Sequence, residues 1–119
     1  MDAEEVYYST RQTIELTGLS KDTLRYYEKI GVLQHIARDV NNYRKYAGED
    51  IEWLILIKHL RAIGIETAEF IGKQHAGDAE RLDYLEKHKL KIEHNIEQLR
   101  QTRDIVNGKI AFLKSRSGS

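Results

Sequence analysis

The chain has 119 residues, enough for one domain of ordinary size with or without an appended element. Its 19 basic and 19 acidic residues give no net charge, which by itself argues against a nucleic-acid-binding protein. It has no cysteine, no membrane-length apolar run and an acidic start, so thiolate metal sites and disulfides are excluded and a cytoplasmic protein, neither exported nor in a membrane, is expected.

Two short helices are predicted near the start of the chain, over about residues 10–17 and 21–30. Each begins after a serine or threonine that can cap it, and each ends at a glycine. Because the joint is a short turn that contains glycine, the pair is typical of a helix-turn-helix. Three leucines are expected to form the contacts between the two helices: Leu16, Leu19 and Leu24.

The second helix has an exposed face with a cation and an aromatic ring. If Leu24 and Ile30 point inward, helical spacing places Arg25 and Tyr26 on the opposite side, flanked by lysines. Arginine can bind guanine edges in the major groove of DNA, and tyrosine hydroxyls can bind phosphates. In a plainer reading, Arg25 forms an ion pair with Glu28 on a solvated face, and spacing alone leaves both readings open.

A β-hairpin, or wing, is predicted over about residues 32–46, where helical periodicity fails. Residues 39–42 supply turn chemistry between flanks rich in Ile, Val and Tyr. The same segment contains more basic than acidic residues. A local nucleic-acid-binding surface is therefore possible, although the whole chain has no net charge. A second helix pair is then predicted, with a strongly apolar helix over about residues 49–63 and a short one at 67–71.

A long charged helix is predicted over residues 78–114, followed by a disordered tail at 115–119. Apolar residues recur in it at alternating steps of three and four, which is the seam of a coiled coil. The apolar seam consists of Leu82, Leu85, Ile92, Ile96, Leu99, Val106, Ile110 and Leu113. Lys89 and Arg103 occupy the two remaining seam positions. One helix cannot bury such a seam alone, so a partner helix is implied; a helix packed on its own domain is the alternative.

Several motifs in this order resemble the DNA-binding domain of the MerR family of transcriptional regulators. They are "YYSTRQTIELTGLSKDTLRYYEKIGVL", "RDVNNYRKY" and "DIEWLILIKHLRAIGI". The resemblance implies a mainly α fold, with a winged helix-turn-helix domain at residues 7–77 and an antiparallel coiled-coil dimer formed by the long helix. It also implies a homodimer that binds a palindromic promoter and distorts the spacer for RNA polymerase, so that part of its specificity arises from DNA deformation.

The resemblance also assigns DNA contacts to residues of the second helix, the wing and the second helix pair. They are Lys21, Thr23, Arg25, Tyr26, Tyr27, Arg38, Tyr43, Arg44 and Arg61. One departure concerns Ala47, which stands where a capping serine is common and is expected to cost about 1 kcal/mol of helix stability.

The signal that controls such a regulator is not named by the sequence. The long helix resembles the subgroup linked to aldehyde and thiol stress, but the reactive cysteine of that subgroup is absent, which excludes thiol sensing. No two histidines are spaced i, i+4, so neither a metal site nor a cofactor is expected. A small-molecule effector, if there is one, is expected to act at the loop 72–77 or at the dimer seam.

The sequence leaves two functions as alternatives to a regulator. The first is a coiled-coil adaptor whose helix-turn-helix surface binds another protein, which the zero net charge favours. The second is an enzyme, which is not expected because no nucleophile–base pair, phosphate loop or carboxylate constellation stands at recognisable spacing.

Overall fold

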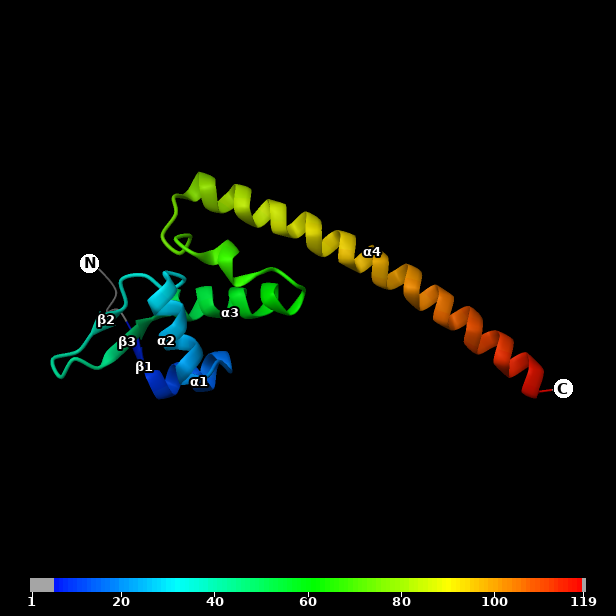
Figure 1. Cartoon of the computed structure of the whole chain (residues 1–119), viewed down its shortest axis with the longest axis horizontal. Helices are drawn as coiled ribbons and strands as arrows, with labels where there is room; N and C mark the ends of the chain where they lie inside the picture. The colour runs from blue at the N-terminus through cyan, green and yellow to red at the C-terminus, as the bar shows by residue number, and fades with distance from the viewer. Residues whose placement is uncertain (1–5, 119) are drawn as a thin grey trace. The chain divides into compact units, whose positions relative to one another are not determined.

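The computed structural model describes residues 6–118 (Figure 1). The acidic start at residues 1–5 and the last residue of the predicted tail, Ser119, lie outside the described residues. The chain divides into two units, residues 6–81 and residues 82–118, and each is considered by itself.

The first unit begins with the helix-turn-helix that the sequence predicts, formed by α1 (Thr10–Thr17) and α2 (Lys21–Ile30). Ser9 caps α1: its Oγ accepts from the N–H of Gln12 at 3.1 Å, and Oε1 of Gln12 accepts from the N–H of Ser9 at 2.9 Å. This reciprocal pair is a capping box. Ser20 caps α2 with its Oγ alone, which accepts from the N–H of Thr23 at 3.0 Å, and the glycines after both helices adopt left-handed φ values of 74° and 87°. The predicted helix starts and ends are confirmed.

The inner face of α1 differs from the prediction. Leu16 is 52% exposed, whereas Thr13 and Thr17 are buried. Thr17 satisfies its hydroxyl by donating to the carbonyl of Thr13 at 2.7 Å, and Lys58 of α3 (Gly48–Ala62) donates to the carbonyl of Thr17 at 2.9 Å. The i, i+4 threonine pair therefore faces α3, and the expectation that Leu16 packs between the helices is wrong. Leu24, at 1% exposure, is in the core as expected.

The wing is present and belongs to a three-stranded antiparallel sheet of order β1-β3-β2 (Figure 1). The predicted hairpin is formed by β2 (Ala37–Arg38) and β3 (Arg44–Ala47) and is shorter than residues 32–46. Its turn is held by Asp39, whose Oδ1 accepts from the N–H groups of Asn41 and Tyr43 at 2.9 Å each. The sequence did not predict β1 (Tyr7–Ser9), which pairs with the other edge of β3.

The helix α3 supplies more of the core of the first unit than any other element. Leu54 and Ile57 of α3 are fully buried, together with Phe70 of the short 3-10 helix η1 (Thr67–Phe70). Ala47 offers no side-chain cap, but its N–H donates to Oδ2 of Asp50 at 2.9 Å, so half of a capping box remains. The predicted second helix pair is confirmed, and its short member is a single 3-10 turn.

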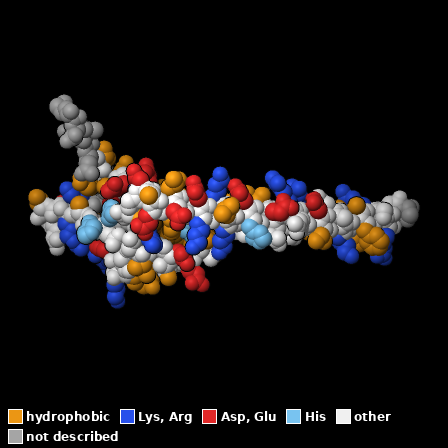
Figure 2. All heavy atoms as spheres, turned by 90° about the horizontal axis from the view of Figure 1, so that it is seen from above, with side chains coloured by type: hydrophobic (Ala, Val, Ile, Leu, Met, Phe, Trp, Pro, Cys, Tyr) orange, Lys and Arg blue, Asp and Glu red, His pale blue; other side chains and the backbone are white. Residues whose placement is uncertain are grey.

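The second unit is formed by α4 (Asp78–Ser117) from Leu82 onward. This helix has 40 residues and spans about 60 Å at 1.5 Å per residue. It continues through three residues that the sequence assigned to a disordered tail. Figure 2 shows hydrophobic side chains recurring along its surface between charged ones. No helix among the described residues is both long and apolar enough to cross a membrane.

Candidate nucleic-acid interface

The side of α2 that faces away from the core carries five exposed residues. Leu24 and Tyr27 are buried at 1% and 2% exposure, and they fix the orientation of the helix. The exposed residues, hereafter the α2 outer face, are Lys21, Asp22, Arg25, Tyr26 and Lys29. Tyr26 is 54% exposed, and its ring lies 6.4 Å from the buried ring of Tyr27. The core thus holds this helix so that its polar face is free for a partner.

Glu28 joins α2 to the wing. Its Oε1 accepts from Nε of Arg44 at 2.7 Å, and its Oε2 lies 3.9 Å from Nη2 of Arg38. The hydrogen bond with Glu28 raises the pKa of Arg44 above its ordinary value. Within residues 6–118, Arg25 makes no ion pair, and the plainer reading of an Arg25–Glu28 pair is therefore wrong. Among the described residues, Glu28 is the only acid of α2 that forms an ion pair. Because its partners lie in the wing, Arg25 is left available.

The wing presents an exposed aromatic residue beside its arginines. Tyr43 is 71% exposed at the end of the turn. Arg38 donates from Nη1 to the carbonyl of Asn42 at 3.1 Å, which holds its side chain along the wing. Arg44 uses only Nε in the hydrogen bonds found within residues 6–118, which leaves its terminal N–H groups available to other acceptors. Guanidinium and phenol groups in this arrangement suit phosphate oxygens.

A hollow of about 460 Å³ lies between the wing and the start of α1. Three basic side chains line it, those of Arg11, Arg44 and Lys45, beside the hydroxyl-bearing Tyr43 and Ser9. Lys45 is held there by the ring of Tyr7, with Nζ 4.2 Å from the ring centroid. The sequence reasoning missed Arg11, because its place beside the wing depends on the pairing of β1 with β3. The N-terminus of α1 adds backbone amides that favour anions.

Two predicted contact residues lie partly or wholly inside the fold. Tyr27 is a core residue, so its ring cannot reach DNA; instead Nη1 of the exposed Arg61 lies 3.4 Å from its hydroxyl, which accepts. Thr23 belongs to the cap of α2, where its Oγ1 accepts from the hydroxyl of Ser20 at 2.9 Å. Burial thus corrects the contact role of Tyr27 to one of supporting Tyr26 and Arg61.

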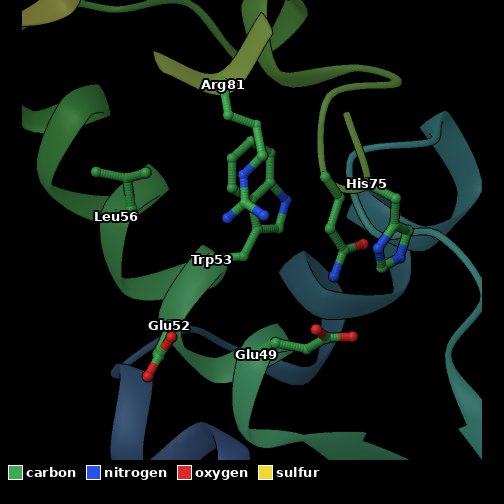
Figure 3. A pocket seen from close by; sticks show the side chains of 7 residues that line it. Glu49, Glu52, Trp53, Leu56, His75 and Arg81 are labelled. Atoms are coloured by element: carbon green, nitrogen blue, oxygen red, sulfur yellow. The ribbon is translucent and has the colours of Figure 1, made fainter. Parts of the chain in front are cut away.

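A second hollow, of about 220 Å³, lies between α3 and the loop 72–77 (Figure 3). Its lining includes Glu49 and Glu52 of α3, whose carboxylates point apart, together with Trp53 and Arg81. No serine, threonine or lysine lines it. Residues 6–118 contain no cluster of three or more histidine, aspartate or glutamate side chains placed to hold a metal ion.

The loop 72–77 is built into the core of the first unit. Gln74 is buried at 5% exposure; its Nε2 donates to Oδ1 of Asp50, and its Oε1 accepts from the N–H of Gln34 at 2.6 Å. His75 lies against the same segment, with Nε2 3.1 Å from the carbonyl of Gln34. Hydrogen bonds of Gln74 therefore connect this loop to Asp50 at the start of α3 and to Gln34 in the segment that precedes the wing.

Comparison with known proteins gives consistent matches. The family model "MerR HTH family regulatory protein" matches residues 8–71. An uncharacterized HTH-type transcriptional regulator of Haemophilus influenzae is 31% identical over 113 residues, which are 90% of this chain and 84% of that protein. The crystal structure of HiNmlR, described as a MerR family regulator lacking the sensor domain and bound to promoter DNA, aligns with a TM-score of 0.78 at 28% identity over 92% of both chains. A putative MerR family regulator of Listeria monocytogenes aligns with a TM-score of 0.74 at 27% identity, over 87% of this chain and 83% of that one.

Proposed function

The chain belongs to the MerR family and is a DNA-binding transcriptional regulator, and from that premise we propose that it acts as a homodimer on a palindromic promoter whose spacer it distorts. The observation that carries this proposal is the pairing of Glu28 with Arg44. It sets the wing beside the α2 outer face while Arg25 stays unpaired within residues 6–118. A helix and a wing held together in this way can bind one groove of a duplex and its adjacent backbone at the same time.

The proposed contact residues divide by role. Arg25 and Tyr26 contact base edges and the neighbouring backbone in the major groove, with Lys21 beside them. Phosphate contacts come from the wing and from α3: the residues are Arg38, Tyr43, Arg44 and Arg61. Arg11 and Lys45 add charge at the hollow beside the wing. The basic groups are thus concentrated on a limited surface, which accounts for DNA binding by a chain of zero net charge.

Dimerisation follows from the exposed seam of α4. Its eight apolar seam residues range from 37% exposed at Ile92 to 69% at Leu99. A two-stranded coiled coil would bury this stripe against a second copy. Two winged domains joined by such a coil would bind the two halves of a palindrome, and their fixed separation would bend or untwist the spacer so that RNA polymerase can engage the promoter.

DNA binding can be measured on the duplex that lies upstream of the protein's own coding region. We expect affinity that falls steeply as salt rises, because phosphate contacts release counterions. Arg25→Ala should reduce discrimination between sequences, while Arg44→Ala should weaken binding to all of them. A protein–protein adaptor, which the zero net charge and Asp22 on the α2 outer face favour, would instead show no binding, or salt-independent binding, to every duplex tested.

A further inference from the structure

The seam of α4 contains two cations that distinguish between the ways in which two helices can pair. In a parallel coil each seam residue faces its own copy, so Lys89 would face Lys89 and Arg103 would face Arg103. Both pairs would bury like charges in the seam, which is strongly unfavourable. In an antiparallel coil each faces a different residue, and an aliphatic partner can contact the stem while the charged head reaches water. This sequence therefore favours antiparallel pairing independently of any resemblance.

Seam spacing then selects one antiparallel register. When Ile96 of one helix lies opposite Leu99 of the other, every seam residue finds a seam partner. The pairs are Leu82 with Leu113, Leu85 with Ile110, Lys89 with Val106, Ile92 with Arg103 and Ile96 with Leu99. A shift by one heptad in either direction removes two seam residues from the interface, Ile110 and Leu113 in one case or Leu82 and Leu85 in the other. All four are more than 40% exposed on the single chain and would remain so.

The charges beside the seam agree with this register. Glu93 and Arg100 occupy equivalent flanking positions one heptad apart. With Ile96 opposite Leu99, Glu93 of each copy lies on the same side of the seam as Arg100 of the other and within about two residues of its level, so two opposite-charge pairs form about the dyad. A shift by one heptad one way brings Glu93 equally near to Glu93, and a shift the other way brings Arg100 equally near to Arg100. Both shifted registers therefore place a like-charge pair at the centre.

Glu93 is free to take part in this interaction. Its nearest cation within residues 82–118 is Lys89, four residues earlier, at 4.0 Å, and the two side chains are 56% and 75% exposed. A solvent-exposed pair at that distance contributes little to stability. The carboxylate can therefore turn to a guanidinium on a second helix without a large loss.

We propose that two copies of α4 pair antiparallel in a single register, with Ile96 opposite Leu99 at the dyad and Glu93 of each copy beside Arg100 of the other. This inference rests on the proposed homodimer and specifies its interface. The register sets where the two helices overlap, and hence the separation of the two DNA-binding units that they connect.

Single cysteines test the register directly, since the chain contains none of its own. Glu93→Cys and Arg100→Cys are prepared separately and treated with a short bifunctional maleimide, each alone and then after the two have been mixed and allowed to exchange subunits. We expect the covalent dimer to form fastest in the mixture. In that register positions 93 and 100 on the two copies differ in level by about two residues, or about 3 Å along the axis at 1.5 Å per residue, whereas Arg100 is about five residues and Glu93 about nine residues from its own copy. Gln98→Cys, at an outward position, is the matched control and should not crosslink.

Each other outcome contradicts the proposal in its own way. Faster crosslinking of Glu93→Cys alone, or of Arg100→Cys alone, than of the mixture would show one of the two shifted registers. A dimer in sedimentation that is crosslinked by neither variant nor by the mixture would show that the dimer exists and that this register is wrong. Monomers of the unmodified chain in sedimentation would refute the proposed homodimer itself, and the register with it.

Discussion

The carboxylate of Glu28 on α2 accepts a hydrogen bond of 2.7 Å from Nε of Arg44 on the wing, sixteen residues later in the chain. The two side chains are only 25% and 27% exposed, so the pair is shielded more than an ordinary surface ion pair. It links the helix proposed to contact bases with the strand proposed to contact phosphates.

Removing Glu28 should lower both stability and the coupling between these elements. We expect Glu28→Ala to reduce the free energy of unfolding by about 1 kcal/mol, because it removes a partly buried, charge-assisted hydrogen bond. A double-mutant cycle with Arg44→Ala, measured by urea unfolding at one protein concentration, should give a coupling energy of similar size. Strictly additive effects of the two substitutions would mean that the pair does not stabilise the wing.

Substitution of Arg25 should alter sequence preference more than overall affinity. A bidentate arginine–guanine contact is worth about 1–3 kcal/mol of discrimination, so Arg25→Ala should cost the preferred operator up to this amount and variant operators less. Titration of the protein against the footprinted operator and its single-base variants would measure the difference. The control is Lys91→Ala, an exposed cation on α4 away from the seam, which should leave the preference unchanged. Equal loss on every sequence would assign Arg25 to the phosphate backbone instead.

Placing a charge in the seam should separate the dimer. Ile96 is proposed to lie at the dyad, where Ile96→Asp would bury two carboxylates close together in an apolar layer. Sedimentation should then show monomers, whereas Gln98→Asp at an outward position should leave the dimer mass unchanged. If Ile96→Asp remained dimeric, the seam would have been assigned to the wrong face of α4.

A serine at position 47 should strengthen the start of α3. Ala47 already has extended N-cap angles, φ −76° and ψ 163°, and lacks only an acceptor for the unpaired amides of the first turn. We expect Ala47→Ser to raise the free energy of unfolding by about 1 kcal/mol. The control Ala62→Ser places the same substitution at the other end of α3 and should not stabilise it. An unchanged midpoint of thermal unfolding for Ala47→Ser would show that Asp50 already satisfies this end of the helix.

The elements that the sequence predicted correctly depend on local chemistry. Ser9 and Ser20 cap helices through residues three positions away, the glycines at 18 and 31 end those helices, and Asp39 holds its turn through neighbours two and four positions away. Interactions of this range can be inferred from a short stretch of sequence.

The features that were missed depend on residues distant in the chain. The strand Tyr7–Ser9 is too short to show alternation, and it forms only because β3 offers a free edge. Thr13 rather than Leu16 is buried, because the docking of α3 decides which face of α1 points inward. The burial of Tyr27 did have a local signal, since it stands three residues after the buried Leu24 on the same helical face.

The most direct test of the central claim is hydroxyl-radical footprinting of the dimer on the DNA upstream of its own coding region. We expect two protected half-sites related by a dyad, with altered cleavage in the unprotected spacer between them and protection that is lost as salt rises. Arg44→Ala should require more protein for the same footprint. The absence of protection at every salt concentration, in a preparation shown by sedimentation to be folded and dimeric, would contradict the account.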